Sequence, residues 1–301
     1  MPKVFITNEI LGKGIELLKQ KGYEVEIGPL KKAKGVDALL CLLTDNIDGE
    51  VMDAIGAQLK IISNYAVGLD NIDLRAAKAR NIIVTNTPGV LTEAVAEHTV
   101  ALILAITRRI VEADRFTRAG KYKGFEPDLL VGMELEGKTL GLVGHGRIGC
   151  RVADMLQKAF GMKVVYYDVV RDEKKEAQCG ITYGSLENVL KEADIVSLHV
   201  SLSGSTRHLI SEKELAFMKR TAYLINTARG AVVDEKALVH ALQTKQIRGA
   251  ALDVFENEPK LASGLTKLEN VVLTPHIASA TTEARGKMAE LAAQNIIKVL
   301  S

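Results

Sequence analysis

Residues 139–149, Thr139-Leu140-Gly141-Leu142-Val143-Gly144-His145-Gly146-Arg147-Ile148-Gly149, are the part of the chain most informative about its fold class. A short apolar run typical of a buried strand leads directly into a G-x-G-x-x-G turn, and residues at helical spacing follow. Glycines are needed there because the turn is tight, a pyrophosphate must approach the backbone, and the helix must pack on the strand. The N-terminus of that helix offers free N–H groups and partial positive charge to phosphates. The sequence therefore predicts a dinucleotide site formed by Gly144, Gly146, Arg147, Ile148 and Gly149.

An acidic residue ends the next predicted strand, 164–168. Asp168 lies 19 residues beyond Gly149, where a carboxylate accepts hydrogen bonds from the adenosine ribose hydroxyls. It also repels a 2′-phosphate, because two unit charges about 4 Å apart at an effective dielectric constant of about 20 interact by about 4 kcal/mol. We therefore predict NAD as the cofactor, in preference to NADP. Arg171, close by in sequence, could weaken that preference.

Short β-rich runs alternate with helical stretches along the whole chain, which predicts an α/β protein with parallel sheets and right-handed crossovers. The runs form two series, which predict two open sheets and hence two domains. Ser211 and Glu214 form a capping box that opens one helix, and Asp234 is a candidate cap for the next. The predicted strands are 4–7, 24–27, 38–43, 61–64 and 82–85 in the first series, and 139–144, 164–168, 195–198, 222–226, 250–254 and 271–274 in the second.

The regions outside the strands also carry predictions. A long apolar helix is expected over Thr92–Phe116, an irregular Gly- and Lys-rich segment over Ala119–Leu135, and a closing helix over Thr281–Leu300. The 92–116 helix is too apolar to be left exposed.

Composition excludes several classes of protein. The chain has 301 residues, and 39 Lys+Arg against 37 Asp+Glu give a net charge of +2, so no global charge favours nucleic acid or an anionic membrane. No apolar run approaches the roughly 20 residues of a spanning helix, and the N-terminus has no apolar signal core. Three cysteines without Cys-x-x-Cys spacing indicate reduced thiols in a cytoplasmic protein. His98 and His240 have no carboxylate or cysteine at metal-ligand spacing, so we expect no metal site.

Three polar residues follow consecutive strands of the second series. Arg229, Glu258 and His276 come after the strands that end near 226, 254 and 274. The carboxyl ends of parallel strands are where such sheets bind ligands. Arginine can hold a carboxylate bidentately, histidine can exchange a proton near neutral pH, and a carboxylate favours the charged imidazole.

Each of these three residues has an ordinary structural interpretation when taken singly: a surface ion pair, a solvated loop residue and a capped loop histidine. Their order, with the nucleotide loop upstream, favours a catalytic site that interconverts a 2-keto acid and a 2-hydroxy acid.

Six motifs together resemble the D-isomer-specific 2-hydroxyacid dehydrogenase family, over nearly the whole chain. They are VGLDNID (67–73), NTPGVLTEAVAEHTVALIL (86–104), GKTLGLVGHGRIG (137–149), LINTARGAVVDEKAL (224–238), ALDVFENEP (251–259) and TPHIASAT (274–281). The resemblance implies that Arg229 binds substrate, that His276 donates and accepts the proton and contacts substrate, and that Glu258 is its partner. It also implies that Val67 and Gly68 offer N–H groups to the substrate carboxylate.

The resemblance extends to cofactor contacts and to domain organisation. It implies that Thr227, Ala228, Asp253 and Ser279 line the nicotinamide end of the site, and that His199, Val200 and Thr206 lie near the adenosine and its linker. It also implies a Rossmann NAD-binding domain, residues 91–274, inserted into a flavodoxin-like substrate domain, residues 1–90 and 275–301. A homodimer formed through the cofactor domain, with the 92–116 helix and the loop after it, is a further implication.

The sequence predicts the substrate less closely than it predicts the family. The segment 62–68 resembles the glyoxylate/hydroxypyruvate reductase branch, and no arginine near Asn64 is present to hold a phosphate. D-3-phosphoglycerate dehydrogenase is the alternative, since short forms of that enzyme exist. An NAD-sensing corepressor-like binding protein and a scaffold without activity are alternatives of other classes.

Overall fold

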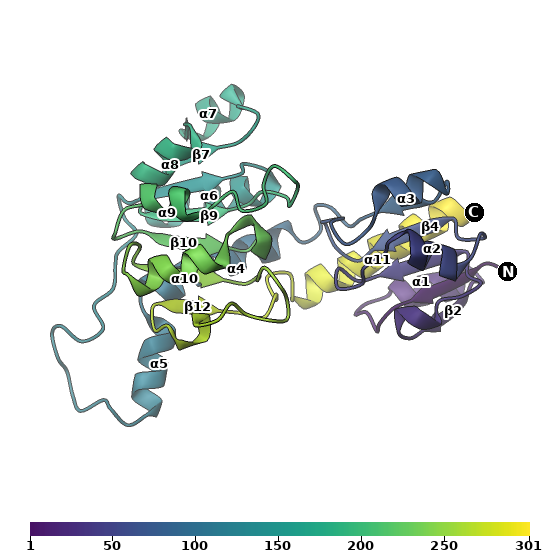
Figure 1. Cartoon of the computed structure of the whole chain (residues 1–301), viewed down its shortest axis with the longest axis horizontal. Helices are drawn as coiled ribbons and strands as arrows, with labels where there is room; N and C mark the ends of the chain where they lie inside the picture. Colours follow the sequence, from purple (N-terminus) through teal and green to yellow (C-terminus); the bar gives the residue numbers. More distant parts are fainter. The chain divides into compact units, whose positions relative to one another are not determined.

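The computed structural model describes residues 1–301, which divide into two compact units. The first unit comprises Met1–Leu91 and Ser279–Ser301, and the second comprises Thr92–Ala278. Each unit is built around its own parallel sheet (Figure 1). The predicted α/β class with two doubly wound sheets is therefore confirmed.

The sheet of the first unit has the strand order β2-β1-β3-β4-β5, the order of flavodoxin-like folds. All its strand pairs are parallel. Its central strands are continuous apolar runs because helices cover both faces of the sheet. The strands are β1 Lys3–Ile6, β2 Glu24–Ile27, β3 Ala38–Cys41, β4 Ile61–Asn64 and β5 Ile83–Thr85.

The helices of the first unit come from both ends of the chain. The closing helix α11 packs against α1 and against strands β3 and β4. The approach to α1 is so close that a Cβ on Gly14 would lie 2.5 Å from the carbonyl oxygen of Ala289. The helices are α1 Gly14–Gln20, the 3-10 turn η1 Leu30–Lys32, α2 Gly49–Ile55, α3 Leu74–Ala79 and α11 Thr282–Leu300.

The sheet of the second unit has the order β12-β11-β10-β9-β6-β7-β8. The chain reverses direction across the sheet between β6 and β9, and ligands bind at this kind of switch point. The strands are β6 Thr139–Val143, β7 Lys163–Tyr167, β8 Thr182–Tyr183, β9 Ile195–Leu198, β10 Tyr223–Asn226, β11 Gly249–Leu252 and β12 Val271–Leu273.

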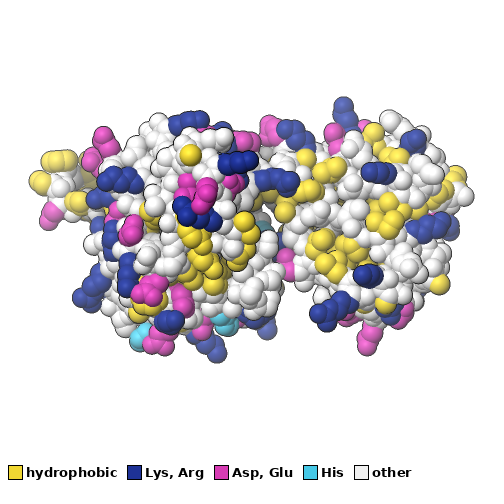
Figure 2. Space-filling view, turned by 90° about the horizontal axis from the view of Figure 1, so that it is seen from above, with side chains coloured by type: hydrophobic (Ala, Val, Ile, Leu, Met, Phe, Trp, Pro, Cys, Tyr) yellow, Lys and Arg dark blue, Asp and Glu magenta, His cyan; other side chains and the backbone are white.

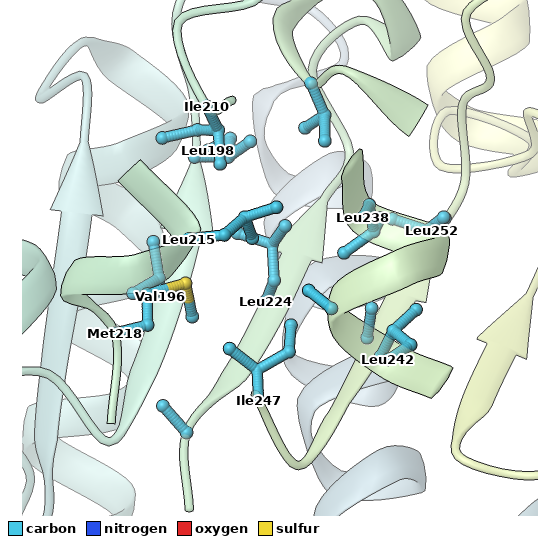
Figure 3. Close-up of a cluster of buried hydrophobic side chains, with 14 of the residues drawn as sticks. Val196, Leu198, Ile210, Leu215, Met218, Leu224, Leu238, Leu242, Ile247 and Leu252 are labelled. Atoms are coloured by element: carbon cyan, nitrogen blue, oxygen red, sulfur yellow. The ribbon is translucent and has the colours of Figure 1, made fainter. Parts of the chain in front are cut away.

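Two apolar layers hold the second sheet in place. On one face α4 and α6 pack together over β6, β10 and β11. On the other face α9 and α10 bury leucines such as Leu215, Leu238 and Leu242 against Val196 and Leu224 of the sheet (Figure 3). The helices are α4 Thr92–Thr107, α5 Ile110–Arg118, α6 Arg147–Phe160, α7 Glu173–Cys179, α8 Leu186–Glu192, α9 Glu212–Phe217 and α10 Glu235–Gln243, with the 3-10 turns η2 Gly230–Val232 and η3 Leu265–Lys267.

Two of the predicted elements need correction. The single helix expected over Thr92–Phe116 is two helices, because Arg109 adopts φ +54° and ends the α-helical path. Its guanidinium then pairs with Glu112 at the start of α5. The edge strand β8 was not predicted, since two residues are too few to show a period. The capping box at Ser211 and the irregular segment over 119–135 are both present.

The surface fits the balanced composition. Figure 2 shows basic and acidic side chains interspersed over the face it draws. None of the helices is both long enough and apolar enough to cross a membrane.

Candidate active site

The predicted site residues of the second unit lie at one edge of its sheet, in loops or in the first turn of the helix α6. Because its strands are all parallel, their carboxyl ends share that edge. The loops follow β6, β7, β9, β10, β11 and β12, and each carries part of the predicted site.

Each of the three glycines of the loop after β6 is required for a different structural reason. Gly144 adopts φ +96°, and a Cβ there would lie 2.7 Å from the backbone carbon of His199. A Cβ on Gly149 would lie 2.5 Å from the carbonyl oxygen of Gly144. A Cβ on Gly146 would meet nothing within 4 Å, so the backbone borders open space there. This is the geometry that a pyrophosphate needs.

Helix α6 adds the electrostatic part of this cradle. It begins at Arg147 directly after Gly146, and no side chain caps its first turn. Its leading N–H groups and the positive end of its dipole therefore remain for an anion. Arg147 is exposed at this end, and Ile148 packs onto the core below it.

Asp168 follows β7 and is tied to the glycine loop. Its Oδ2 accepts a hydrogen bond of 2.7 Å from the N–H of His145. The His145 ring is buried and packs on Tyr166 with centroids 4.6 Å apart. Burial lowers the pKa of His145, and the charge of Lys175 makes a smaller contribution in the same direction. Both favour the neutral ring.

The segment after β9 lies beside the end of β6, at the switch point of the sheet. The N–H of His199 donates to Val143, which ties this segment to β6. Burial lowers the pKa of His199 to about 3, so its ring is neutral, and its Nε2 lies 2.9 Å from the hydroxyl of Ser197. Val200 packs on the core nearby. Thr206 shapes the turn that follows, because its hydroxyl donates to the carbonyl of Ser201 at 2.7 Å.

The loop after β10 is held by an asparagine. The amide of Asn226 accepts from the N–H of Ala228 at 3.0 Å and donates to the carbonyl of Arg229 at 2.9 Å. Thr227 is buried, and its hydroxyl lies 2.9 Å from that of Thr99 on α4. The clamp fixes the backbone from which the Arg229 guanidinium extends.

A glycine joins this loop to the next. A Cβ on Gly230 would lie 1.9 Å from the backbone carbon of Phe255, so only glycine fits. The contact brings the Arg229 turn against the loop after β11 that carries Glu258. The charge of Arg229 acts on Glu258 in consequence.

Glu258 and His276 form the predicted pair. Nδ1 of His276 lies 2.9 Å from Oε2 and 3.2 Å from Oε1 of Glu258. Burial would raise the pKa of Glu258, but the hydrogen bonds from His276 and from the N–H of Phe255, with the charges of His276 and Arg229, lower it overall. Glu258 therefore stays ionised and engages Nδ1, which leaves Nε2 as the ring nitrogen for chemistry.

Asp253 braces the histidine loop from the protein interior. Its side chain is wholly buried, and it accepts hydrogen bonds from the Thr274 hydroxyl at 2.6 Å, from the N–H of Ile277 at 2.9 Å and from the N–H of Ala278 at 2.8 Å. Nε2 of His98 lies 3.4 Å away. His276 itself adopts φ +55°, held by hydrogen bonds from its N–H to the carbonyls of Asp253 and Thr274.

Three predicted residues belong to the first unit. Val67 and Gly68 lie in the turn after β4, where their carbonyl oxygens accept from Asn86 at 2.7 Å and Asn64 at 2.8 Å. Ser279 opens the segment that leads to α11.

Four residues of this arrangement were not predicted as parts of the site: Asn226, Gly230, Thr274 and His98. Asn226 and Gly230 flank Arg229 within three residues in sequence, so the motif itself contained a signal for both. His98 and Asp253 lie on separate elements, and only folding brings them together.

Comparison with known proteins gives consistent results. A family model described as D-isomer specific 2-hydroxyacid dehydrogenase, NAD binding domain, matches residues 100–278. The glyoxylate reductase of Thermofilum pendens is 54% identical, over 99% of this chain and 91% of its own. That of Thermococcus litoralis is 51% identical, over 98% and 93%. The crystal structure of the TT0316 protein from Thermus thermophilus superposes with a TM-score of 0.92 at 45% identity, over 99% of this chain and 96% of that one.

Proposed function

Since the chain belongs to the D-isomer-specific 2-hydroxyacid dehydrogenases, we propose that it is an NAD-dependent glyoxylate/hydroxypyruvate reductase. The observation that carries the proposal is the pairing of His276 with ionised Glu258, in the field of Arg229, at the sheet edge that also bears the glycine loop. About half of the residues are identical to those of proteins named glyoxylate reductase, over nearly the full chain. This similarity supports the choice of substrate.

The substrate carboxylate requires a fixed cation, and Arg229 supplies it. The guanidinium can hold a carboxylate through two parallel hydrogen bonds, and its charge also polarises the adjacent ketone. The Asn226 clamp and the Gly230 contact keep its backbone from moving. Val67 and Gly68 are proposed to bind substrate through their backbone N–H groups.

The ketone oxygen requires a proton, and His276 supplies it. Glu258 engages Nδ1, so Nε2 faces the reaction as donor in reduction and as acceptor in oxidation. Glu258 is anionic and can accept a hydrogen bond from Nδ1–H while Nε2 donates its proton. The left-handed backbone of His276 aims the ring, and Asp253 holds the residues that follow it.

The chain's residues fit a dinucleotide. When bound, the nicotinamide supplies the hydride that the ketone carbon receives. Gly144, Gly146 and Gly149 would admit the pyrophosphate, α6 would present its N–H groups, and Asp168 would accept from the ribose hydroxyls. Thr206, His199 and Val200 would flank the adenosine side, and Thr227, Ala228, Asp253 and Ser279 the nicotinamide side.

We also propose that the protein is a homodimer formed through the second unit. The segment from α5 to β6 extends away from the sheet (Figure 1). It leaves large apolar side chains exposed to solvent. Phe125 is 88% exposed, and Ile110, Tyr122 and Val131 are more than half exposed. A partner copy would cover them. The cytoplasm is the proposed location, supported by three cysteines that are all free thiols.

The test is a spectrophotometric assay of NADH consumption with three substrates. Glyoxylate and hydroxypyruvate are expected to be reduced with kcat/KM well above that for 3-phosphohydroxypyruvate. A preference for the phosphorylated substrate would assign the protein to phosphoglycerate dehydrogenase instead. No turnover of any of them, with NADH still bound, would favour a binding protein.

A further inference from the structure

Arg171 is the cation that bears on the choice between NADH and NADPH. In dinucleotide-binding folds an arginine near the ribose accommodates the 2′-phosphate. Arg171 lies three residues after Asp168, and its side chain is about half exposed. In sequence alone it is therefore a candidate phosphate ligand, and its surroundings decide whether it can serve.

The guanidinium of Arg171 is already engaged by a carboxylate of its own chain. Nε lies 2.8 Å from Oε1 of Glu176, and Nη2 lies 2.9 Å from Oε2, which is a bidentate pair. The remaining Nη1 lies 3.4 Å from Glu173. On its other side, the Cζ of Arg171 lies 5.6 Å from the centre of the Tyr183 ring. Nε and one N–H of Nη2 are thus hydrogen-bonded to Glu176, and Nη1 is within ion-pair distance of Glu173.

Glu176 is itself held in place. Its side chain is only 14% exposed, and its Oε1 accepts a hydrogen bond of 3.1 Å from the hydroxyl of Tyr166. That hydroxyl in turn accepts from the N–H of Asp172, at the start of α7. The pairing with Arg171 holds the pKa of Glu176 below its ordinary value, so the carboxylate is charged.

The neighbouring cation is neutralised in the same way. Lys175 pairs with Asp172 at 3.3 Å. Arg171 and Lys175 are therefore both paired with carboxylates of this segment.

We propose that Glu176 is a specificity-determining residue, which selects against NADPH by holding Arg171 away from the 2′-phosphate. It acts through Arg171, and it adds to the direct repulsion by Asp168. The inference rests on the proposed function as a dinucleotide-dependent reductase.

The test is Glu176→Gln, which keeps the shape of the side chain and removes its charge. Because the chain has no tryptophan to report binding, the dissociation constants of NADH and NADPH are measured from the fluorescence of the bound reduced nicotinamide. The KM of each dinucleotide is measured with glyoxylate as the substrate. The Kd of NADPH is expected to fall about tenfold, as for a charge-assisted arginine–phosphate contact at a half-exposed site, and that of NADH to change less than about twofold.

The matched control is Glu173→Gln. It makes the same change in net charge beside the same arginine but leaves the bidentate pair intact, so it is expected to change the Kd of NADPH by less than about twofold. Adding Arg171→Ala to Glu176→Gln is expected to abolish the gain. If Glu176→Gln does not fold, Glu176→Ala carries the same expectation.

Equal effects of the two Glu→Gln variants, or a gain that persists without Arg171, would overturn the inference, since net charge alone would explain them. An unchanged Kd of NADPH in both Glu176 variants would overturn it as well. If the wild-type chain bound neither dinucleotide, the proposed function would fail first, and the two failures are therefore distinguishable.

Discussion

Asp253→Asn tests whether the buried carboxylate positions His276. Asp253 uses one oxygen for Ile277 and Thr274 and the other for Ala278. Asparagine must place its NH₂ group against one of these donors, so at least one buried backbone N–H loses its acceptor. Each such loss costs about 1–3 kcal/mol, so we expect the variant to be about 2–4 kcal/mol less stable. For a unit of this size that lowers the melting temperature by roughly 5–15 °C.

Catalysis should fall with stability in this variant. The loosened segment follows His276 directly, and a small displacement of a catalytic group can reduce turnover by up to about 10²-fold. We expect kcat to fall about 10- to 100-fold when NADH consumption with glyoxylate is followed below the melting transition. Circular dichroism on heating gives the stability of the same samples.

The matched control is Asp194→Asn. Asp194 also accepts from a backbone N–H, that of Thr139 at 2.9 Å, and pairs with Lys219, but it lies at the amino end of the strands. This variant should lose stability and keep kcat. If Asp253→Asn kept both the melting temperature and kcat of the wild type, or lost no more activity than Asp194→Asn, the positioning role would be wrong.

The buried carboxylate of Asp253 also predicts how the stability of the protein depends on pH. Burial would raise the pKa of Asp253, but the hydrogen bonds from His98, Thr274, Ile277 and Ala278 lower it overall. The folded pKa is thus below the unfolded value of about 3.9, so the stabilisation is complete above that value and is lost as pH falls through the folded pKa. Urea titrations from pH 6 down should show a smaller loss of stability in Asp253→Asn than in the wild type.

Four further variants test the rest of the site. Arg229→Ala should lose turnover and substrate affinity together while NADH binding survives; normal turnover would remove its substrate role. His276→Gln should leave NADH and substrate binding largely intact and slow reduction by roughly 10²–10⁴-fold, and a near-normal rate would mean that another acid serves. Gly230→Ala should misfold the loop or abolish activity, because its Cβ would overlap Phe255. Gly146→Ala, whose Cβ meets nothing within 4 Å, should fold normally but bind NADH more weakly. Titration of both variants with NADH measures the difference.

Most of the fold could be predicted from local sequence. The second series of strands is nearly continuous Val, Ile and Leu, and that pattern indicates strands buried on both faces. The glycine loop and Asp168 predicted a dinucleotide site. The resemblance predicted the family, the enzyme class and an NAD-binding domain, and the comparisons confirm these three. The break at Arg109 was missed, because a single left-handed residue leaves no trace in hydrophobic periodicity.

Local sequence was enough to predict the chemical groups and their order along the chain, because strand patterns, glycine spacing and loop position are local properties. Which of these groups meet depends on how the chain folds. The tertiary structure places Nδ1 of His276 at 2.9 Å from Glu258, seals Asp253 in the interior, and turns Arg171 toward Glu176. These contacts depend on how loops from different strands pack at one edge, and a side chain's charge and direction there depend on neighbours that are distant in sequence.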